Sequence, residues 1–164
     1  MRWAALFLVV ACTREPHRVE VCKAPEDSCR PPVVAKSLQG AQVDDESLRG
    51  KVVLVNFWAT WCAPCAKELP AIQRVYERNK DKGLVVLGLI SADPATDDEI
   101  VKFASGYGVS FPMVRASDQQ ETAFGLGSVL PTTFLYDRAG RLRRHWDGAI
   151  KEDALEDEVK VLLP

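Results

Sequence analysis

The chain has 164 residues, of which 47% are hydrophobic and 27% charged, as in a soluble globular protein with one compact domain and a modest extra segment. This composition excludes a disordered chain, a collagen-like chain and a polytopic membrane protein. Twenty-one Lys and Arg against 23 Asp and Glu give a net charge of −2, so no broad basic face for nucleic acid is expected. Five cysteines make an odd number, and their positions carry most of the functional information.

The first twelve residues have the character of an export signal. A basic start at Met1-Arg2 precedes an apolar run, Trp3 to Ala11, that is too short to span a bilayer. The run ends in Val9-Val10-Ala11-Cys12, which resembles the lipobox of bacterial lipoproteins, where the signal is cut before the cysteine and the cysteine is acylated. We therefore expect a lipoprotein-type signal over residues 1–12 and lipidation of Cys12, with a plain signal peptide or a start assigned too early as the alternatives.

Without Cys12, the remaining cysteines form two close pairs, Cys22/Cys29 and Cys62/Cys65. Residues 13–35 contain four prolines and no sustained periodicity, which predicts a Pro-rich tether. The first pair encloses a polar turn in this tether, and a structural disulfide there would contribute on the order of 2–3 kcal/mol. A second redox pair that exchanges with Cys62/Cys65 is the alternative.

A folded domain is expected over residues 36–164, with strands and helices in alternation. Continuous apolar or β-branched runs predict strands at 51–57, 84–90, 111–115, 132–136 and 142–146, the last two flanking the turn 137–140. Helical patterns follow at 62–79, from Ser91-Ala92-Asp93-Pro94 to about Tyr107, at 119–124 and at 151–163. This order predicts an α/β fold with a mixed central sheet flanked by helices.

The Cys62-Ala63-Pro64-Cys65 segment lies where the first predicted strand meets a helix. The helix N-terminus offers unsatisfied N–H groups and a positive dipole, which favour a Cys62 thiolate, and Cys65 is close enough to resolve a mixed disulfide. A zinc site lacks a second ligand pair, and haem attachment would need histidine where Ala66 stands. A static disulfide remains as an alternative to redox catalysis.

Two sequence blocks resemble the thioredoxin superfamily, and more closely its TlpA/ResA/CcmG-like branch of periplasm-facing reductases. The first reads Asn-Phe-Trp-Ala-Thr-Trp-Cys-Ala-Pro-Cys over residues 56–65 and continues through Lys67-Glu68-Leu69-Pro70. The second reads Leu-Pro-Thr-Thr-Phe-Leu over residues 130–135, just before the turn 137–140. The resemblance covers residues 36–164 and implies a thioredoxin-like fold with an N-terminal extension and a central αβ insertion, working without a cofactor or metal.

Several residue roles follow from this resemblance. Pro131 matches the cis-proline of the family, which lies beside the cysteine pair and presents the preceding backbone, here Leu130, to an extended substrate segment. Pro70 matches the proline that bends the active-site helix. Trp61 is expected to form an exposed platform for substrate next to the nucleophile.

Glu68 falls within the apolar sector of the predicted active-site helix, one turn after Cys65. A carboxylate in such surroundings should have a raised pKa and could transfer protons to or from the cysteines. The resemblance supports this role, because the branch places an acidic residue there, whereas Asn56 occupies the position of the buried Asp of thioredoxins and cannot titrate. The alternative is that Glu68 reaches water at the edge of the apolar stripe.

These observations predict a lipid-anchored thiol-disulfide oxidoreductase on the periplasmic side of a bacterial membrane. By resemblance, it reduces exported proteins with paired cysteines, such as apocytochrome c, with electrons from a membrane thiol-disulfide donor. A disulfide oxidase or isomerase on the same site and a non-catalytic thioredoxin-like binding protein are the alternatives. A thiol peroxidase would need a peroxidatic cysteine in its own motif, which we do not find in the sequence.

Overall fold

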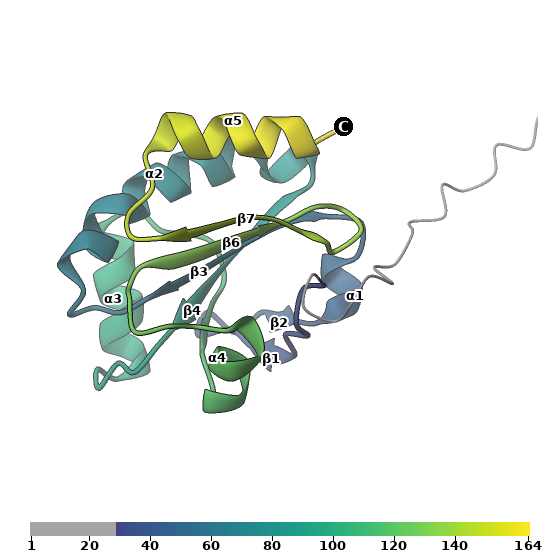
Figure 1. Cartoon of the computed structure of the whole chain (residues 1–164). Coiled ribbons are helices and arrows are strands. Elements are labelled where there is room, and N and C mark those ends of the chain that lie inside the picture. Colours follow the sequence, from purple (N-terminus) through teal and green to yellow (C-terminus); the bar gives the residue numbers. More distant parts are fainter. Residues whose placement is uncertain (1–28) are drawn as a thin grey trace, which may run out of the picture.

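The computed structural model describes residues 29–164, so Cys12, Cys22, the predicted signal and most of the predicted tether lie outside the described residues. Figure 1 shows a central sheet between two layers of helices and short strands. The strands are β1 (Ala35–Lys36), β2 (Gln42–Val43), β3 (Val52–Trp58), β4 (Leu84–Ile90), β5 (Met113–Arg115), β6 (Thr132–Tyr136) and β7 (Leu142–Asp147). The helices are α1 (Asp45–Leu48), α2 (Ala63–Asn79), α3 (Asp97–Gly106), α4 (Asp118–Phe124) and α5 (Glu152–Leu162), with a 3₁₀ turn at Lys80–Lys82.

The main sheet has five strands in the order β5-β4-β3-β6-β7. β3, β4 and β5 run parallel, while β6 and β7 are antiparallel to their neighbours, so the sheet is mixed as predicted. All seven residues of β3 are buried, because a central strand covered on both faces has no solvent side. Helix α2 connects β3 to β4, as a parallel pair requires.

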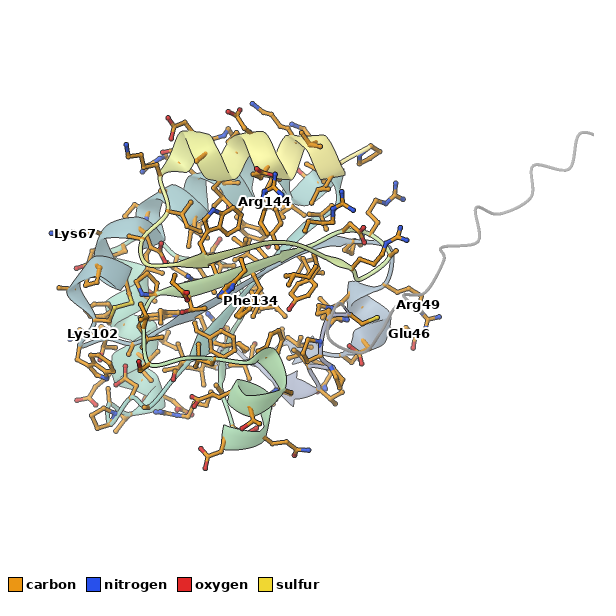
Figure 2. The ribbon with its side chains drawn as sticks, viewed as in Figure 1. Glu46, Arg49, Lys67, Lys102, Phe134 and Arg144 are labelled. Carbon is orange, nitrogen blue, oxygen red and sulfur yellow. A yellow bond between two sulfur atoms is a disulfide. The ribbon has the colours of Figure 1, made fainter. Side chains whose placement is uncertain are left out.

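Side chains that alternate along β3 divide the core into two layers. Leu54 and Trp58 pack in a cluster with residues of α2, α3 and α5. Val55 and Phe57 pack on the opposite face, where α1, the β1–β2 pair and α4 lie (Figure 1). Phe134, labelled in Figure 2, belongs to this second layer, with its ring centroid 6.1 Å from that of Phe57. The active-site helix therefore lies on the face with Leu54 and Trp58.

The start of α3 differs from the prediction. A helix was expected from Ser91-Ala92-Asp93-Pro94, but α3 begins at Asp97. Thr96 and Glu99 form a capping box that fixes this start, and the Asp93 carboxylate accepts a hydrogen bond from the Ala95 N–H in the loop before it. The predicted start is therefore wrong, because capping by Thr96 decides where the helix begins.

Residues before the predicted domain boundary at residue 36 already pack against the folded domain. Val33 is fully buried, and the Arg30 N–H donates to the Gly140 carbonyl over 2.8 Å. The Arg30 guanidinium also pairs with Asp45 at 2.8 Å. The short elements β1, β2 and α1 were not predicted. Their two- to four-residue length leaves no periodic pattern in the sequence.

Candidate redox site

The cysteine pair lies at the carboxyl end of β3, where the chain turns into α2. Cys62 is the N-cap of α2, and its Sγ accepts a hydrogen bond from the Cys65 N–H over 3.2 Å. Pro64 lies in the first helical turn, where its missing N–H leaves no hydrogen bond unmade. A thiolate at Cys62 would therefore face a backbone donor and the positive end of the helix dipole, and both lower a thiol pKa.

The two cysteines form a disulfide with an S–S distance of 1.98 Å and a Cα–Cα distance of 5.3 Å. Cys65 is completely buried, whereas Cys62 retains 4% of its surface exposed. Cys62 is therefore the sulfur that a partner can reach, and Cys65 is placed to attack it from within. This arrangement supports dithiol exchange.

Glu68 lies one turn further along α2 and is only 2% exposed. Its Oε1 accepts a hydrogen bond from Asn56 Nδ2 over 2.8 Å, and its Oε2 accepts one from the Ile150 N–H over 2.9 Å. Burial raises the pKa of Glu68 to about 7, although both hydrogen bonds oppose the rise. The alternative that Glu68 reaches water is thus wrong, and its carboxyl group titrates near neutral pH.

Asn56 and Thr133 complete this buried polar cluster. They lie directly opposite each other on β3 and β6, and Asn56 Nδ2 donates to Thr133 Oγ1 over 2.9 Å. Sequence reasoning missed Thr133 and the Ile150 backbone, because the strand register and a loop contact bring them to Glu68. The polar Asn56 within an otherwise apolar buried strand was the only local signal.

Trp61 is 59% exposed, as expected of a platform beside the nucleophile. Its Nε1 donates to the carbonyl of Ala92, a residue held at φ 45°. Asp93 accepts hydrogen bonds from the N–H and the hydroxyl of Thr60, which ties the loop after β4 to the loop before the cysteines. Asp93 was not predicted as a site residue, because it lies 33 residues from Thr60 in sequence.

A shallow pocket of about 430 Å³ lies against this platform. Its lining comprises Thr60, Trp61, Asp93, Pro94, Ala95, Glu99 and Phe103.

The Leu130–Pro131 peptide bond is cis, as the resemblance implies. The next residue, Thr132, pairs with Phe57 near the carboxyl end of β3, so Pro131 lies at the same edge of the sheet as the cysteines. Leu130 packs against the cluster that contains Cys62, and its backbone makes no hydrogen bond within residues 29–164. The structure therefore gathers the predicted catalytic and substrate-binding residues at one end of the sheet.

The remaining predicted site residues concern the N-terminal segment. Cys12 and Cys22 lie outside the described residues, so lipidation and the Cys22–Cys29 pairing stay predictions. Cys29 is disulfide-bonded, and it forms a β-bridge with Arg141. Between residues 29 and 164, no helix has the length and apolar character needed to cross a membrane.

Comparison with known proteins agrees with this geometry. A family model described as the AhpC/TSA family matches residues 27–145, which is more than half of the chain. The chain belongs to the AhpC/TSA family of the thioredoxin superfamily. The fold class predicted from the sequence is thereby confirmed.

Sequence relatives identify the chemistry, and solved structures share the fold. The thiol-disulfide oxidoreductase ResA of Bacillus thuringiensis (strain Al Hakam) is 36% identical over 135 residues, or 82% of this chain and 76% of the relative. A thioredoxin family thiol:disulfide interchange protein from Chlorobium tepidum TLS has a TM-score of 0.76 at 24% identity, over 82% of this chain and 95% of its own. A secreted Mycobacterium tuberculosis disulfide oxidoreductase homologous to E. coli DsbE has a TM-score of 0.69 at 25% identity, over 79% and 96%. With its buried cysteine pair, this AhpC/TSA-family chain is a thiol-disulfide oxidoreductase.

Proposed function

We propose that the protein reduces disulfides in exported proteins, such as apocytochrome c, from the outer side of a bacterial membrane. The observation that carries the proposal is the Cys62–Cys65 disulfide at the N-terminus of α2, with the buried Glu68 one turn behind it. The thiol-disulfide oxidoreductase relatives support the chemistry, and the secreted character of the M. tuberculosis protein supports the compartment.

In the proposed reaction, the Cys62 thiolate attacks a substrate disulfide and releases one substrate thiolate. Cys65 then attacks the Cys62 sulfur of the mixed disulfide, which releases the second substrate thiolate and closes the Cys62–Cys65 bond. Two electrons pass to the substrate, and the released thiolates take up protons from solvent. Glu68 accepts the proton that leaves the Cys65 thiol, for which a pKa of about 7 is well matched. A membrane thiol-disulfide donor then returns the pair to the dithiol form.

The substrate segment is placed by Leu130, Pro131 and Trp61. The hydrogen-bonding groups of the Leu130 backbone are unused within residues 29–164, so an extended chain can pair with them beside Cys62. The exposed Trp61 ring, next to Cys62 in sequence, offers an apolar contact for the substrate. An acyl chain on Cys12 would hold the domain at the membrane through residues 13–28.

The reduction potential of Cys62/Cys65 tests the direction of this reaction. After equilibration with glutathione or dithiothreitol buffers and thiol trapping, we expect a value near or below about −250 mV, as in thioredoxin-like reductases. A value between about −120 and −180 mV would contradict the proposal and favour the oxidase or isomerase.

Insulin reduction tests whether the pair is catalytic at all. Activity should fall below detection in Cys62→Ser, because this residue supplies the attacking sulfur. Activity that persists in this variant would instead assign the reaction to other thiols.

A further inference from the structure

Two arginines of the described chain make no ion pair, and they line the same pocket. The other arginines of residues 29–164 all pair with carboxylates: Arg30, Arg74, Arg78, Arg115, Arg141, Arg143 and Arg144. Arg49 and Arg138 are the exceptions, and both are exposed. They line a shallow pocket of about 90 Å³ together with Lys51, which is likewise exposed and without an ion pair in residues 29–164.

The two carboxylates that line this pocket are bound by other groups. Asp45 pairs with the Arg30 guanidinium at 2.8 Å. Asp137 accepts hydrogen bonds from N–H groups of its own turn, and Arg141 and Arg143 share its charge. No lining residue therefore neutralises the three unpaired cations of the pocket.

The unpaired cations are held around one point of the backbone. Arg138 Nε donates to the Gly50 carbonyl over 3.1 Å, which ties the turn between β6 and β7 to the residue between Arg49 and Lys51. The Nη groups of Arg138 make no hydrogen bond within residues 29–164. Guanidinium N–H groups fit the oxygens of a phosphate, and an ammonium adds further donors. The pocket is therefore suited to a small oxyanion such as a phosphate group.

The pocket lies at the end of the sheet where the described chain enters the domain. The Arg30 N–H donates to the Gly140 carbonyl, and both residues line the pocket. Figure 2 shows Arg49 at this end, whereas Lys67 and Lys102 lie at the opposite end. Lys51 directly precedes β3 and the cysteine pair follows it, so the length of that strand separates the pocket from the disulfide.

The end of the sheet with the disulfide is acidic. The helices that follow β4 and β5 both begin with carboxylates, which are Asp97, Asp98 and Glu99 in α3 and Asp118 and Glu121 in α4. At the pocket end, the α1 carboxylates Asp44 and Glu46 offset part of the positive charge, but Arg141 and Arg143 have only Asp137 between them. An anionic surface would therefore attract the pocket end and repel the disulfide end.

We propose that Arg49, Lys51 and Arg138 bind phosphate groups of anionic phospholipids, so that the domain rests on a membrane with its disulfide directed away from the surface. The contact consists of charged hydrogen bonds, and no covalent bond forms or breaks. The place of the pocket favours a lipid over an acidic substrate protein, because the residues proposed to hold substrate lie at the other end. The inference shares only the proposed membrane location with the function above, so neither the reduction potential nor insulin reduction decides it.

Vesicle binding of the full chain tests the proposal. Replacement of the three cations by Arg49→Gln, Lys51→Gln and Arg138→Gln should lower the partition coefficient on phosphatidylglycerol-containing vesicles by about 10²-fold, as expected for three cations at an anionic surface. Binding to phosphatidylcholine vesicles should not change. Any membrane affinity of residues 1–12 is common to both proteins and cancels in the ratio. An unchanged partition coefficient on the anionic vesicles would overturn the proposal.

The matched control removes the same charge from the other end of the domain. Lys67, Lys102 and Lys151 are also exposed and unpaired within residues 29–164, and Lys151 follows Ile150, which donates to Glu68. Their joint replacement by Gln should lower the partition coefficient less than about threefold, because β3 spans roughly 20 Å and salt screens charges beyond about 10 Å. A loss as large as that of the first variant would overturn the assignment to this pocket.

Two measurements on the wild-type chain need no variant to fold. In phosphatidylglycerol bicelles with a nitroxide-labelled headgroup, the amide resonances of Gly50 and Gly140 should broaden while that of Trp61 Nε1–H stays sharp. Broadening of Trp61 in place of the glycines would overturn the orientation. Inorganic phosphate should shift the Gly50 resonance only at millimolar concentrations, and micromolar affinity for it without vesicle binding would overturn the lipid assignment in favour of a free anion.

Discussion

Helix α2 has a buried carboxylate near each of its ends, one on α2 itself and one contributed by α5. The two environments differ in the charge of the hydrogen-bond partners. Glu68, near the N-terminus of α2, is 2% exposed and bonded to uncharged donors. Glu156, on α5, is 8% exposed and accepts hydrogen bonds from the Arg78 guanidinium and the Asn79 amide near the C-terminus of α2. Burial raises the pKa of each, but at Glu156 the bonds and charges of its partners outweigh it and hold the pKa below its usual range.

The difference separates a carboxylate that packs two helices from one that can exchange a proton. A cation beside Glu156 keeps it ionised at all physiological pH values, which suits a contact between α2 and α5. Glu68 has no cation partner in the described part of the chain, so burial dominates and its carboxyl group has a pKa of about 7. Burial alone therefore does not identify a functional carboxylate, and the charge of its partners is the better criterion.

The largest effect is expected from Glu68→Gln, which removes the titrating group and keeps its shape. Disulfide exchange near pH 7 should slow by about 10²-fold, as expected from the loss of a general base.

The same substitution should also change the free energy of unfolding. The rise in the pKa of Glu68 from 4.5 to about 7 corresponds to about 3 kcal/mol of lost stability once Glu68 is ionised. The variant should therefore be more stable than the wild type at pH 8, by up to that amount.

The sign of this pH dependence follows from proton binding. Between pH 4.5 and about 7, the folded chain keeps the Glu68 proton while the unfolded chain loses it, so wild-type stability falls as the pH rises through this window. Urea unfolding at pH 5 and pH 8 measures the effect. A gain of equal size at both pH values would show that Gln acts by packing and not by removing a charge.

A smaller effect is expected when Glu156 is made to resemble Glu68. Arg78→Met removes its guanidinium partner and should destabilise the fold by about 2 kcal/mol at pH 7, because a mostly buried carboxylate loses its main cation. The loss should shrink as the pH falls and Glu156 takes up a proton, because the unpaired charge is then removed. Restoration of stability in the double variant Arg78→Met/Glu156→Gln would assign the loss to the unpaired charge, and no restoration would assign it to the Arg78 stem.

The smallest effect is expected at Glu77, an exposed carboxylate on α2 paired with Lys80 at 2.5 Å. Hydrogen bonds from Lys80 and Ser110 lower the pKa of Glu77, but water screens the charge. Glu77→Gln should leave the urea midpoint and the rate of disulfide exchange within experimental error. A resolvable loss of stability would mean that exposed pairs on α2 contribute as much as buried ones.

The sequence predicts the elements whose signal is local. Strands β4 and β6 have their predicted boundaries, because their apolar runs are bounded by turn residues or a proline. The cysteine pair at the start of α2 and the buried position of Glu68 follow from spacing along one helix.

What the sequence does not predict depends on contacts between distant segments. The partners of Glu68 come from β3, 12 residues away, and from the loop before α5, 82 residues away. Thr133 reaches Asn56 only through the register of β3 with β6. The late start of α3 likewise coincides with a tertiary contact, since Asp93 bonds to Thr60 across 33 residues.

The place where the described chain enters the domain has a consequence for orientation. Cys29 and Arg30 join the turn between β6 and β7, and that turn lies beyond the first residues of β3, because Val53 pairs with Tyr136. In Figure 1 this entry point lies near α1, away from the N-terminus of α2. The seven residues of β3 span roughly 20 Å, and the disulfide follows their carboxyl end. A domain held by its N-terminal segment would therefore carry the disulfide at the end of the sheet opposite to the point of attachment. For a domain anchored through an acylated Cys12, as proposed above, residues 13–28 would span at most about 55 Å if fully extended, which would let the domain turn over and present the same two sulfurs to the proposed membrane donor.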